Sequence, residues 1–122
     1  MDKPHKKLDV WRLSMQLVKD VYGVTNRCFP KEEKFGLTDQ VRRAAISIPS
    51  NIAEGAARNT KKEFANFLHI AQGSLSELDT QMELARELGY VDPHLWEGLN
   101  ASMERVDKML SGLIRHQKVV KT

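Results

Sequence analysis

Lysine and arginine side chains gather in three stretches of the chain, where their chemistry is the binding of phosphate groups. They are Lys3, Lys6, Lys7 and Arg12 in the first stretch, Arg42, Arg43, Arg58, Lys61 and Lys62 in the second, and Arg115, Lys118 and Lys121 in the third. Cations that contact phosphates release condensed counterions, so such binding weakens steeply as salt rises. Because no base-reading motif accompanies them, the pattern predicts contacts with the backbone and shape of RNA or DNA. The alternative is that several of the arginines pair with Glu32, Glu33 or Glu54.

Side chains that could hold a metal ion or act in catalysis are scattered along the chain. Di-iron bundles use Glu-x-x-His pairs and many zinc proteases use His-Glu-x-x-His, and neither spacing occurs here. The histidines stand in four different segments, at His5, His69, His94 and His116. Cys28 is the only cysteine, so it cannot form an intramolecular disulfide, and we interpret it as structural. We therefore expect a protein that is not an enzyme and that uses no metal or cofactor.

Polar side chains recur beside small residues in two central stretches. They include Asn51 and Glu54 in the first stretch, and Glu77 and Gln81 in the second. One interpretation makes these residues a ligand pocket. The favoured interpretation makes them hydrogen-bonding groups between helices or subunits, which can fix the register and the oligomeric state of a bundle.

Apolar residues also lie outside the main hydrophobic stripes of the same two stretches. They are Ile46, Ala53 and Ala57 in the first, and Phe67, Ile70 and Leu84 in the second. A four-helix monomer cannot easily cover all of them, and an exposed apolar patch commonly marks an interface. We therefore expect a homo-oligomer with Phe67 at its interface. The alternative is that the N-terminal arm covers these residues.

The chain has 122 residues, which is enough for one domain with a modest core. Its net charge is +3, but the charge is unevenly distributed, since residues 63–92 carry six carboxylates and one arginine. No apolar run approaches the roughly 18 residues that suggest a membrane span, and the first residues lack the apolar core of a signal peptide. We expect a cytoplasmic protein with no membrane partner.

Hydrophobic residues recur at spacings of three and four in four segments of the chain. This periodicity predicts four helices over residues 8–28, 38–58, 61–88 and 93–118. Pro49 falls inside the second helix, where we expect a kink because the apolar stripe keeps its phase across the proline. The pattern predicts an all-α, up-down four-helix bundle that forms a single domain over residues 1–122.

Residues suited to helix ends accompany these segments. Asp9 and Thr38 are suitable N-caps for the first and second helices. Thr60 and Glu63 form a capping-box pair at the start of the third helix, and Gly89 is suited to end it.

Three runs of sequence carry a family resemblance: VRRAAISIPSNIAEGAAR at 41–58, EFANFLHIAQGSLSELDTQ at 63–81 and ELGYV at 87–91. They closely resemble the four-helix-bundle proteins encoded by intervening sequences within bacterial 23S rRNA genes, which are related to the accessory proteins of diversity-generating retroelements. The resemblance extends from LDVWRLSMQLVKDVY to KMLSGLI and so covers nearly the whole chain.

The resemblance implies a bundle that assembles into a ring-like homo-oligomer, a pentamer, with no known catalytic activity. For the retroelement relatives it implies nucleic-acid binding alongside a reverse transcriptase. We therefore expect a non-enzymatic, oligomeric accessory protein that binds RNA or DNA through a basic surface. The alternative is a protein scaffold without nucleic-acid binding, whose partner meets the acidic outer face of the third helix, including Asp79, Glu83 and Glu87.

Overall fold

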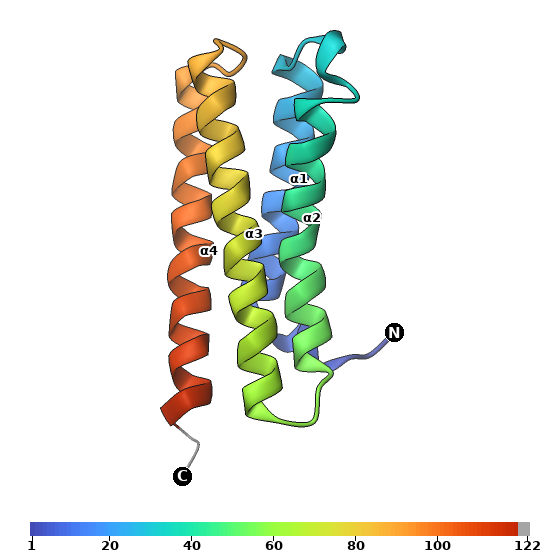
Figure 1. Cartoon of the computed structure of the whole chain (residues 1–122), viewed down its shortest axis with the longest axis vertical. Helices are drawn as coiled ribbons and strands as arrows, with labels where there is room; N and C mark the ends of the chain where they lie inside the picture. Colours follow the sequence, from blue (N-terminus) through green and yellow to red (C-terminus); the bar gives the residue numbers. More distant parts are fainter. Residues whose placement is uncertain (120–122) are drawn as a thin grey trace.

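The computed structural model describes residues 1–119, and all the regular structure in this range is helical (Figure 1). Four long helices follow one another: α1 (Asp9–Cys28), α2 (Leu37–Ala56), α3 (Lys61–Glu87) and α4 (Pro93–Val119). Two short 3-10 turns, η1 (Pro4–Lys7) and η2 (Lys31–Glu33), precede α1 and α2. The predicted all-α class with four helices is confirmed for the described residues. Lys121, which belongs to the third basic stretch, lies outside them.

Successive helices run in opposite directions, so the bundle is up-and-down (Figure 1). α2 and α3 share the most extensive contact, and α4 packs against both α3 and α1 to close the bundle. One end of the bundle holds the start of α1, the α2–α3 link and the end of α4. The opposite end holds the α1–α2 and α3–α4 links.

The apolar stripes predicted from the periodicity form the core. On α3, the residues Leu68, Ala71, Leu75, Leu78 and Met82 are buried, in step with the alternating spacing of three and four. The other helices contribute buried stripes of the same kind, including Leu17 and Val21 on α1, Val41, Ile48 and Ile52 on α2, and Leu99, Val106 and Leu110 on α4. Burying one such side chain stabilises the fold by about 1.5–3 kcal/mol, so these stripes are the main source of stability.

Small residues let α2 and α3 approach closely. A methyl group placed on Gly55 of α2 would lie 2.6 Å from Cβ of Phe67 and 3.0 Å from Cδ1 of Phe64 on α3. Further along the same contact, the hydroxyl oxygens of Ser47 and Ser74 lie 2.8 Å apart. Pro49 is buried within α2, and the helix continues through it without a break.

The N-caps predicted for α1 and α2 differ from those in the structure. Asp9 is the first residue of α1 rather than its N-cap, and its carboxylate pairs with Arg12 instead. Thr38 lies inside α2, whose first amide, that of Leu37, donates to Glu33 Oε1 at 3.0 Å. Both of these N-cap predictions are therefore wrong, because residues further upstream begin the helices.

The N-cap predicted for α3 and the glycine predicted to end it are confirmed, whereas the capping box forms only in part. The amide of Glu63 donates to Thr60 Oγ1 at 3.1 Å, and the Thr60 hydroxyl donates to the Glu63 carboxylate at 3.0 Å. At the other end, Gly89 adopts a φ of +77°. The amides of Gly89 and Tyr90 donate to the carbonyls of Arg86 and Ala85, at 3.0 and 2.9 Å. This is a Schellman ending, which requires the left-handed conformation that glycine adopts without strain.

Candidate nucleic-acid interface

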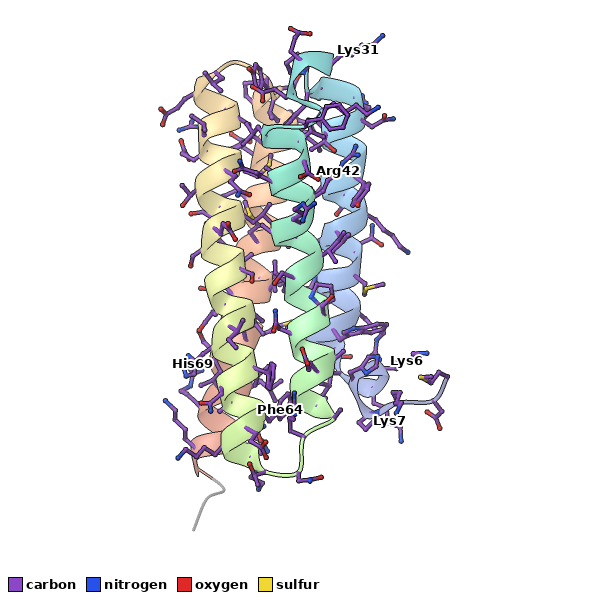
Figure 2. All side chains as sticks on the ribbon, turned by 45° about the vertical axis from the view of Figure 1, so that its right-hand side comes forward. Lys6, Lys7, Lys31, Arg42, Phe64 and His69 are labelled. Atoms are coloured by element: carbon purple, nitrogen blue, oxygen red, sulfur yellow. The ribbon has the colours of Figure 1, made fainter. Side chains whose placement is uncertain are left out.

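The up-and-down topology gathers most of the predicted phosphate-binding residues at one end of the bundle, which we call the basic end. Its members come from the arm before α1, the α2–α3 link and the last turns of α4. They are Lys3, Lys6, Lys7, Arg12, Arg58, Lys61, Lys62, Arg115 and Lys118, and every one of them is exposed. Figure 2 shows Lys6 and Lys7 at this end, with Phe64 and His69 of α3.

Only some of these cations are held by internal contacts. Arg12 pairs with Asp9 and donates to the carbonyl of Lys6 at 2.7 Å. Arg58 approaches Glu54 at 3.4 Å, and its guanidinium lies 4.7 Å from the centre of the Phe67 ring. Within residues 1–119, no ion pair involves the lysines of the basic end or Arg115. Of the expected pairings with Glu32, Glu33 or Glu54, the basic end therefore shows only that of Arg58 with Glu54, whereas Arg12 pairs with Asp9. The Lys6 ammonium group donates to the carbonyl of Met1.

A groove opens between the first turns of α3 and the last turns of α4 at the basic end. Its volume is about 280 Å³, and it is lined by Lys61, Lys62, Asn66, His69, Gln117 and Lys118, with Ala65. Among residues 1–119, no carboxylate lines it. The N-terminus of a helix also carries a partial positive charge, so the start of α3 adds to the positive potential of the groove.

Arg42 and Arg43 lie at the opposite end from the other candidates (Figure 2). The Arg42 guanidinium lies 4.5 Å from the centre of the Tyr22 ring and donates to Thr25 Oγ1 at 2.9 Å. Arg43 donates to Asp39 at 2.9 Å. The structure therefore divides the second basic stretch, and these two arginines make contacts within and between α1 and α2.

The polar residues predicted to join helices fall into different environments. Asn51 donates to the carbonyl and the hydroxyl of Ser47, at 2.8 and 2.9 Å, beside the Ser47–Ser74 contact between α2 and α3. Gln81 is buried, and its Oε1 has no hydrogen-bond partner within the described range. Glu54 and Glu77 are exposed. Phe67 is half-buried in the close α2–α3 contact near Gly55, rather than standing free on the surface.

A contact that the sequence did not reveal joins the two links at the end opposite the basic end. The Glu33 carboxylate accepts from the Leu37 amide and, at 2.9 Å, from the Tyr90 hydroxyl. These hydrogen bonds, the one from Leu37 first, lower the pKa of Glu33 below its ordinary value. The same carboxylate raises the pKa of Tyr90, because ionisation would remove the donated proton.

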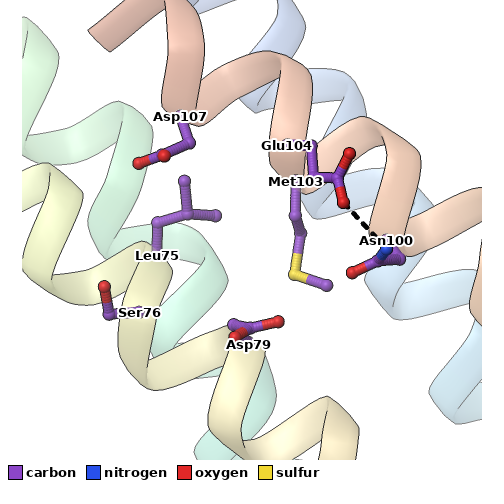
Figure 3. Close-up of a pocket in the computed structure, with 7 residues that line it drawn as sticks. All are labelled: Leu75, Ser76, Asp79, Asn100, Met103, Glu104 and Asp107. Carbon is purple, nitrogen blue, oxygen red and sulfur yellow. Dashed lines mark hydrogen bonds between the residues drawn. The ribbon is translucent and has the colours of Figure 1, made fainter. Parts of the chain in front are cut away.

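A second groove, between the middle turns of α3 and α4, has acidic walls (Figure 3). Asp79, Glu104 and Asp107 surround a floor that includes Leu75 and Met103, and the groove has a volume of about 290 Å³. Asn100 donates to Glu104 at 3.2 Å. Within the described part of the chain, no group of three or more acidic, histidine or cysteine side chains is arranged to hold a metal ion.

Several large apolar side chains are exposed. Ile70 and Leu84 on α3 are 51% and 47% exposed, and Ile46 on α2 is 42% exposed. Ile46 also borders a groove of about 340 Å³ between α1 and α2, which Trp11 and Met15 help to line. None of the described helices is long and apolar enough to cross a membrane.

These features define an up-and-down four-helix bundle with one basic end and an acidic groove along its side. The family model of the 23S rRNA-intervening sequence protein matches residues 6–112. The chain therefore belongs to this family, and the resemblance noted in its central helices is confirmed.

Solved structures support the same fold. A protein of unknown function from the S23 ribosomal protein family of Bacteroides thetaiotaomicron VPI-5482 is 23% identical in sequence and superposes with a TM-score of 0.79. The match covers 86% of this chain and 97% of that one. No curated protein is significantly similar in sequence.

Proposed function

We propose that this protein is a non-enzymatic accessory protein that binds the phosphate backbone of RNA or DNA through its basic end. The observation that carries the proposal is the convergence of cations from three separate basic stretches on one end of the bundle, where each of the nine cations that form the basic end is exposed. A localised positive surface attracts polyanions and raises their local concentration. The absence of a base-reading motif in the sequence favours binding that depends little on base sequence.

Self-assembly would strengthen this binding. We propose that copies associate through exposed apolar residues on the outer surfaces of α2 and α3, which include Ile46, Ile70 and Leu84. The family resemblance favours a ring-like pentamer. A closed ring repeats one basic end per subunit, and linked sites increase the overall affinity for a long polyanion.

The proposal is tested by measuring the anisotropy of labelled structured RNA and duplex DNA as protein is added. We expect Lys61→Glu with Lys62→Glu to weaken binding about tenfold or more, because two cations are replaced by anions at the basic end. The matched control is Lys31→Glu with Lys34→Glu, which makes the same change in charge on exposed residues at the opposite end. Equal losses from both variants would show that total charge, and not the basic end, determines binding.

The acidic groove favours a second candidate function, that of a protein scaffold. Asp79, Glu104 and Asp107 over an apolar floor match a partner segment that is rich in lysine, arginine and apolar residues. Under this alternative, a labelled basic amphipathic peptide binds, and Glu104→Gln with Asp107→Asn weakens that binding. Absence of nucleic-acid binding at low salt, from a folded protein, would shift the proposal to this scaffold.

A further inference from the structure

An apolar groove lies between α1 and α2, and one half of it reaches the basic end. Its volume is about 340 Å³, and its apolar lining consists of Trp11, Met15, Val18, Ile46, Pro49 and Ala53. Because α1 and α2 are antiparallel, Trp11 near the start of α1 and Ala53 near the end of α2 belong to the half at the basic end, which we call the near half. Val18 and Ile46 belong to the other half. Among residues 1–119, no lysine, arginine or carboxylate lines the groove.

The arm before α1 places lysines at the rim of the near half. η1 packs against both α1 and α2, and the His5 ring lines the groove. This ring meets the Trp11 ring edge to face, with 4.9 Å between the ring centres. Arg12 also holds the arm, because it donates to the carbonyl of Lys6 at 2.7 Å. Lys6 and Lys7 directly follow His5 and are exposed (Figure 2). Positive charge at the rim therefore adjoins an apolar interior.

A nucleotide combines the two properties that this arrangement suits. Its phosphate is anionic and matches the lysines at the rim. Its base is a flat, largely apolar ring system, similar in size to the side chain of Trp11. Proteins that bind single strands without regard to sequence commonly combine a basic surface with side chains on which the bases stack. Bases in a duplex are already stacked and paired, so only an unpaired base can enter such a groove.

A comparable groove on the other side of α1 lacks this combination. It lies between α1 and α4 and has a volume of about 320 Å³, and the carboxylate residue Asp9 is part of its lining. Negative charge beside a groove disfavours a nearby phosphate. Met109 lines this α1–α4 groove as Met15 lines the α1–α2 groove. The α1–α4 groove therefore provides a matched control.

We propose that the near half of the α1–α2 groove binds an unpaired base of a single-stranded nucleic acid, while Lys6 and Lys7 contact the phosphates beside it. The inference rests on the proposed function, because the rest of the basic end holds the adjoining backbone. It adds a preference for strands with unpaired bases over a bare sugar-phosphate backbone. The other half of the groove, with Ile46, stays available to the proposed contact between copies.

The test compares two single strands that have the same number of phosphates. One is a short thymine oligodeoxynucleotide, and the other is the same backbone with every residue abasic. Fluorescence anisotropy of the labelled strands gives the ratio of their affinities. We expect the thymine strand to bind about tenfold more tightly, an effect within the range measured for one stacked base. We expect this ratio to stay constant as salt rises, since both strands release the same number of counterions.

The double variant Met15→Gln with Ala53→Gln tests the groove without changing any charge. It replaces an apolar side chain by a polar one and fills the near half, so we expect the ratio to fall close to one. Met15 is 37% exposed, so the fold should survive, as judged by circular dichroism. Ala53→Gln alone should also lower the ratio, which keeps the test valid if the double variant does not fold. The matched control, Met109→Gln with Gly112→Gln, places the same two side chains in the α1–α4 groove and should keep the ratio.

Each outcome decides between the proposals. Equal affinities for the two strands in the unaltered protein would overturn this inference and leave backbone binding intact. A ratio that survives in the folded groove variants, or that falls equally in the control, would place the base elsewhere and also overturn it. Groove variants that keep the ratio but form smaller assemblies by light scattering would assign the groove to contact between copies. Failure of both strands to bind at low salt would overturn the proposed function itself.

Discussion

The Glu33 carboxylate shows how a single side chain can connect two links that are far apart in the chain. It accepts from the Leu37 amide at the start of α2 and from the hydroxyl of Tyr90, which lies 57 residues further on. Gly36 leaves room for this arrangement, because a methyl group on it would lie 2.8 Å from Glu33 Oε1. The contact therefore ties the α1–α2 link to the α3–α4 link.

This contact predicts that stability changes with pH at both extremes. The pKa of folded Glu33 lies below its ordinary value of 4.5, so the unfolded chain binds the proton more tightly. The contribution of Glu33 is therefore fully present above about pH 4.5 and lost as the pH falls through its folded-state pKa. The pKa of folded Tyr90 lies above its ordinary value of 10.0, so that contribution is present below about pH 10 and lost as the pH rises further.

Urea unfolding of the parent and of Tyr90→Phe across the pH range checks this prediction. We expect Tyr90→Phe to be less stable near neutral pH and to lose the alkaline decline that Tyr90 causes. Glu33→Gln should flatten the acid limb, because the amide does not titrate there. Parallel stability curves for the parent and Tyr90→Phe at high pH would contradict the assigned contact.

Long-range contacts between single side chains, such as that of Glu33 with Tyr90, are the hardest to predict from the sequence. The sequence predicts Glu33 only as a possible partner for an arginine, and no local pattern relates it to Tyr90. The bond from the Glu63 amide to the Thr60 hydroxyl was predicted correctly because both residues lie within one helical turn. Sequence spacing thus indicates local hydrogen bonds, whereas a long-range hydrogen bond requires the fold.

At the scale of elements, the close contact between α2 and α3 depends on Gly55. We predict that Gly55→Ala destabilises the protein by about 1–3 kcal/mol, since the added methyl would lie 2.6 Å from Cβ of Phe67. The helix propensity gained from alanine, at most about 1 kcal/mol, does not offset the overlap. The change is measured as the free energy of unfolding in urea.

Gly73→Ala is the matched control for this prediction. Gly73 lies in α3, is exposed, and has no atom within 4 Å of an added methyl. We expect its replacement to stabilise the protein by about 0.5–1 kcal/mol through helix propensity alone. If Gly55→Ala proved as stabilising as Gly73→Ala, the close packing of α2 on α3 would be incorrect.

The helices themselves were largely predictable because their apolar stripes repeat strongly. All four predicted segments lie within two residues of the observed bounds, and the stripe on α3 is buried as expected. The caps of α1 and α2 were less predictable. Several polar residues near a helix start can satisfy its first amides. In the structure, Leu8 and Gly36 occupy the N-cap positions of α1 and α2. The first amide of α2 donates to the side chain of Glu33, which lies upstream of the helix.

In the whole molecule, folding brings together cations that lie far apart in the sequence. In an up-and-down bundle of four helices, the N-terminus, the link between the second and third helices and the C-terminus meet at one end. The basic end follows from this rule together with the positions of the cations (Figure 1). Arg42 and Arg43 could have been excluded by the same rule, since they follow the first link and therefore lie at the other end.

The proposed self-association gives a prediction at this scale. Replacing Ile70 and Leu84 by glutamate should lower the mass in solution, because charged side chains oppose burial in an apolar interface. Both residues are about half exposed, so the fold of each subunit should survive, as judged by circular dichroism. Light scattering gives the mass.

Phe35→Glu, at a side chain that is 89% exposed in the α1–α2 link, is the control and should leave the mass unchanged. An unchanged mass for the double variant at Ile70 and Leu84 would place the interface elsewhere.

The salt dependence of binding to duplex DNA shows whether the basic end contacts phosphates. For each phosphate contact that is lost, the slope of log affinity against log salt becomes shallower by about 0.9. We expect a shallower slope for Lys61→Gln with Lys62→Gln, and an unchanged slope for Lys31→Gln with Lys34→Gln at the opposite end. If the first variant kept the slope of the parent while remaining folded, the basic end would not be where the protein meets the phosphate backbone.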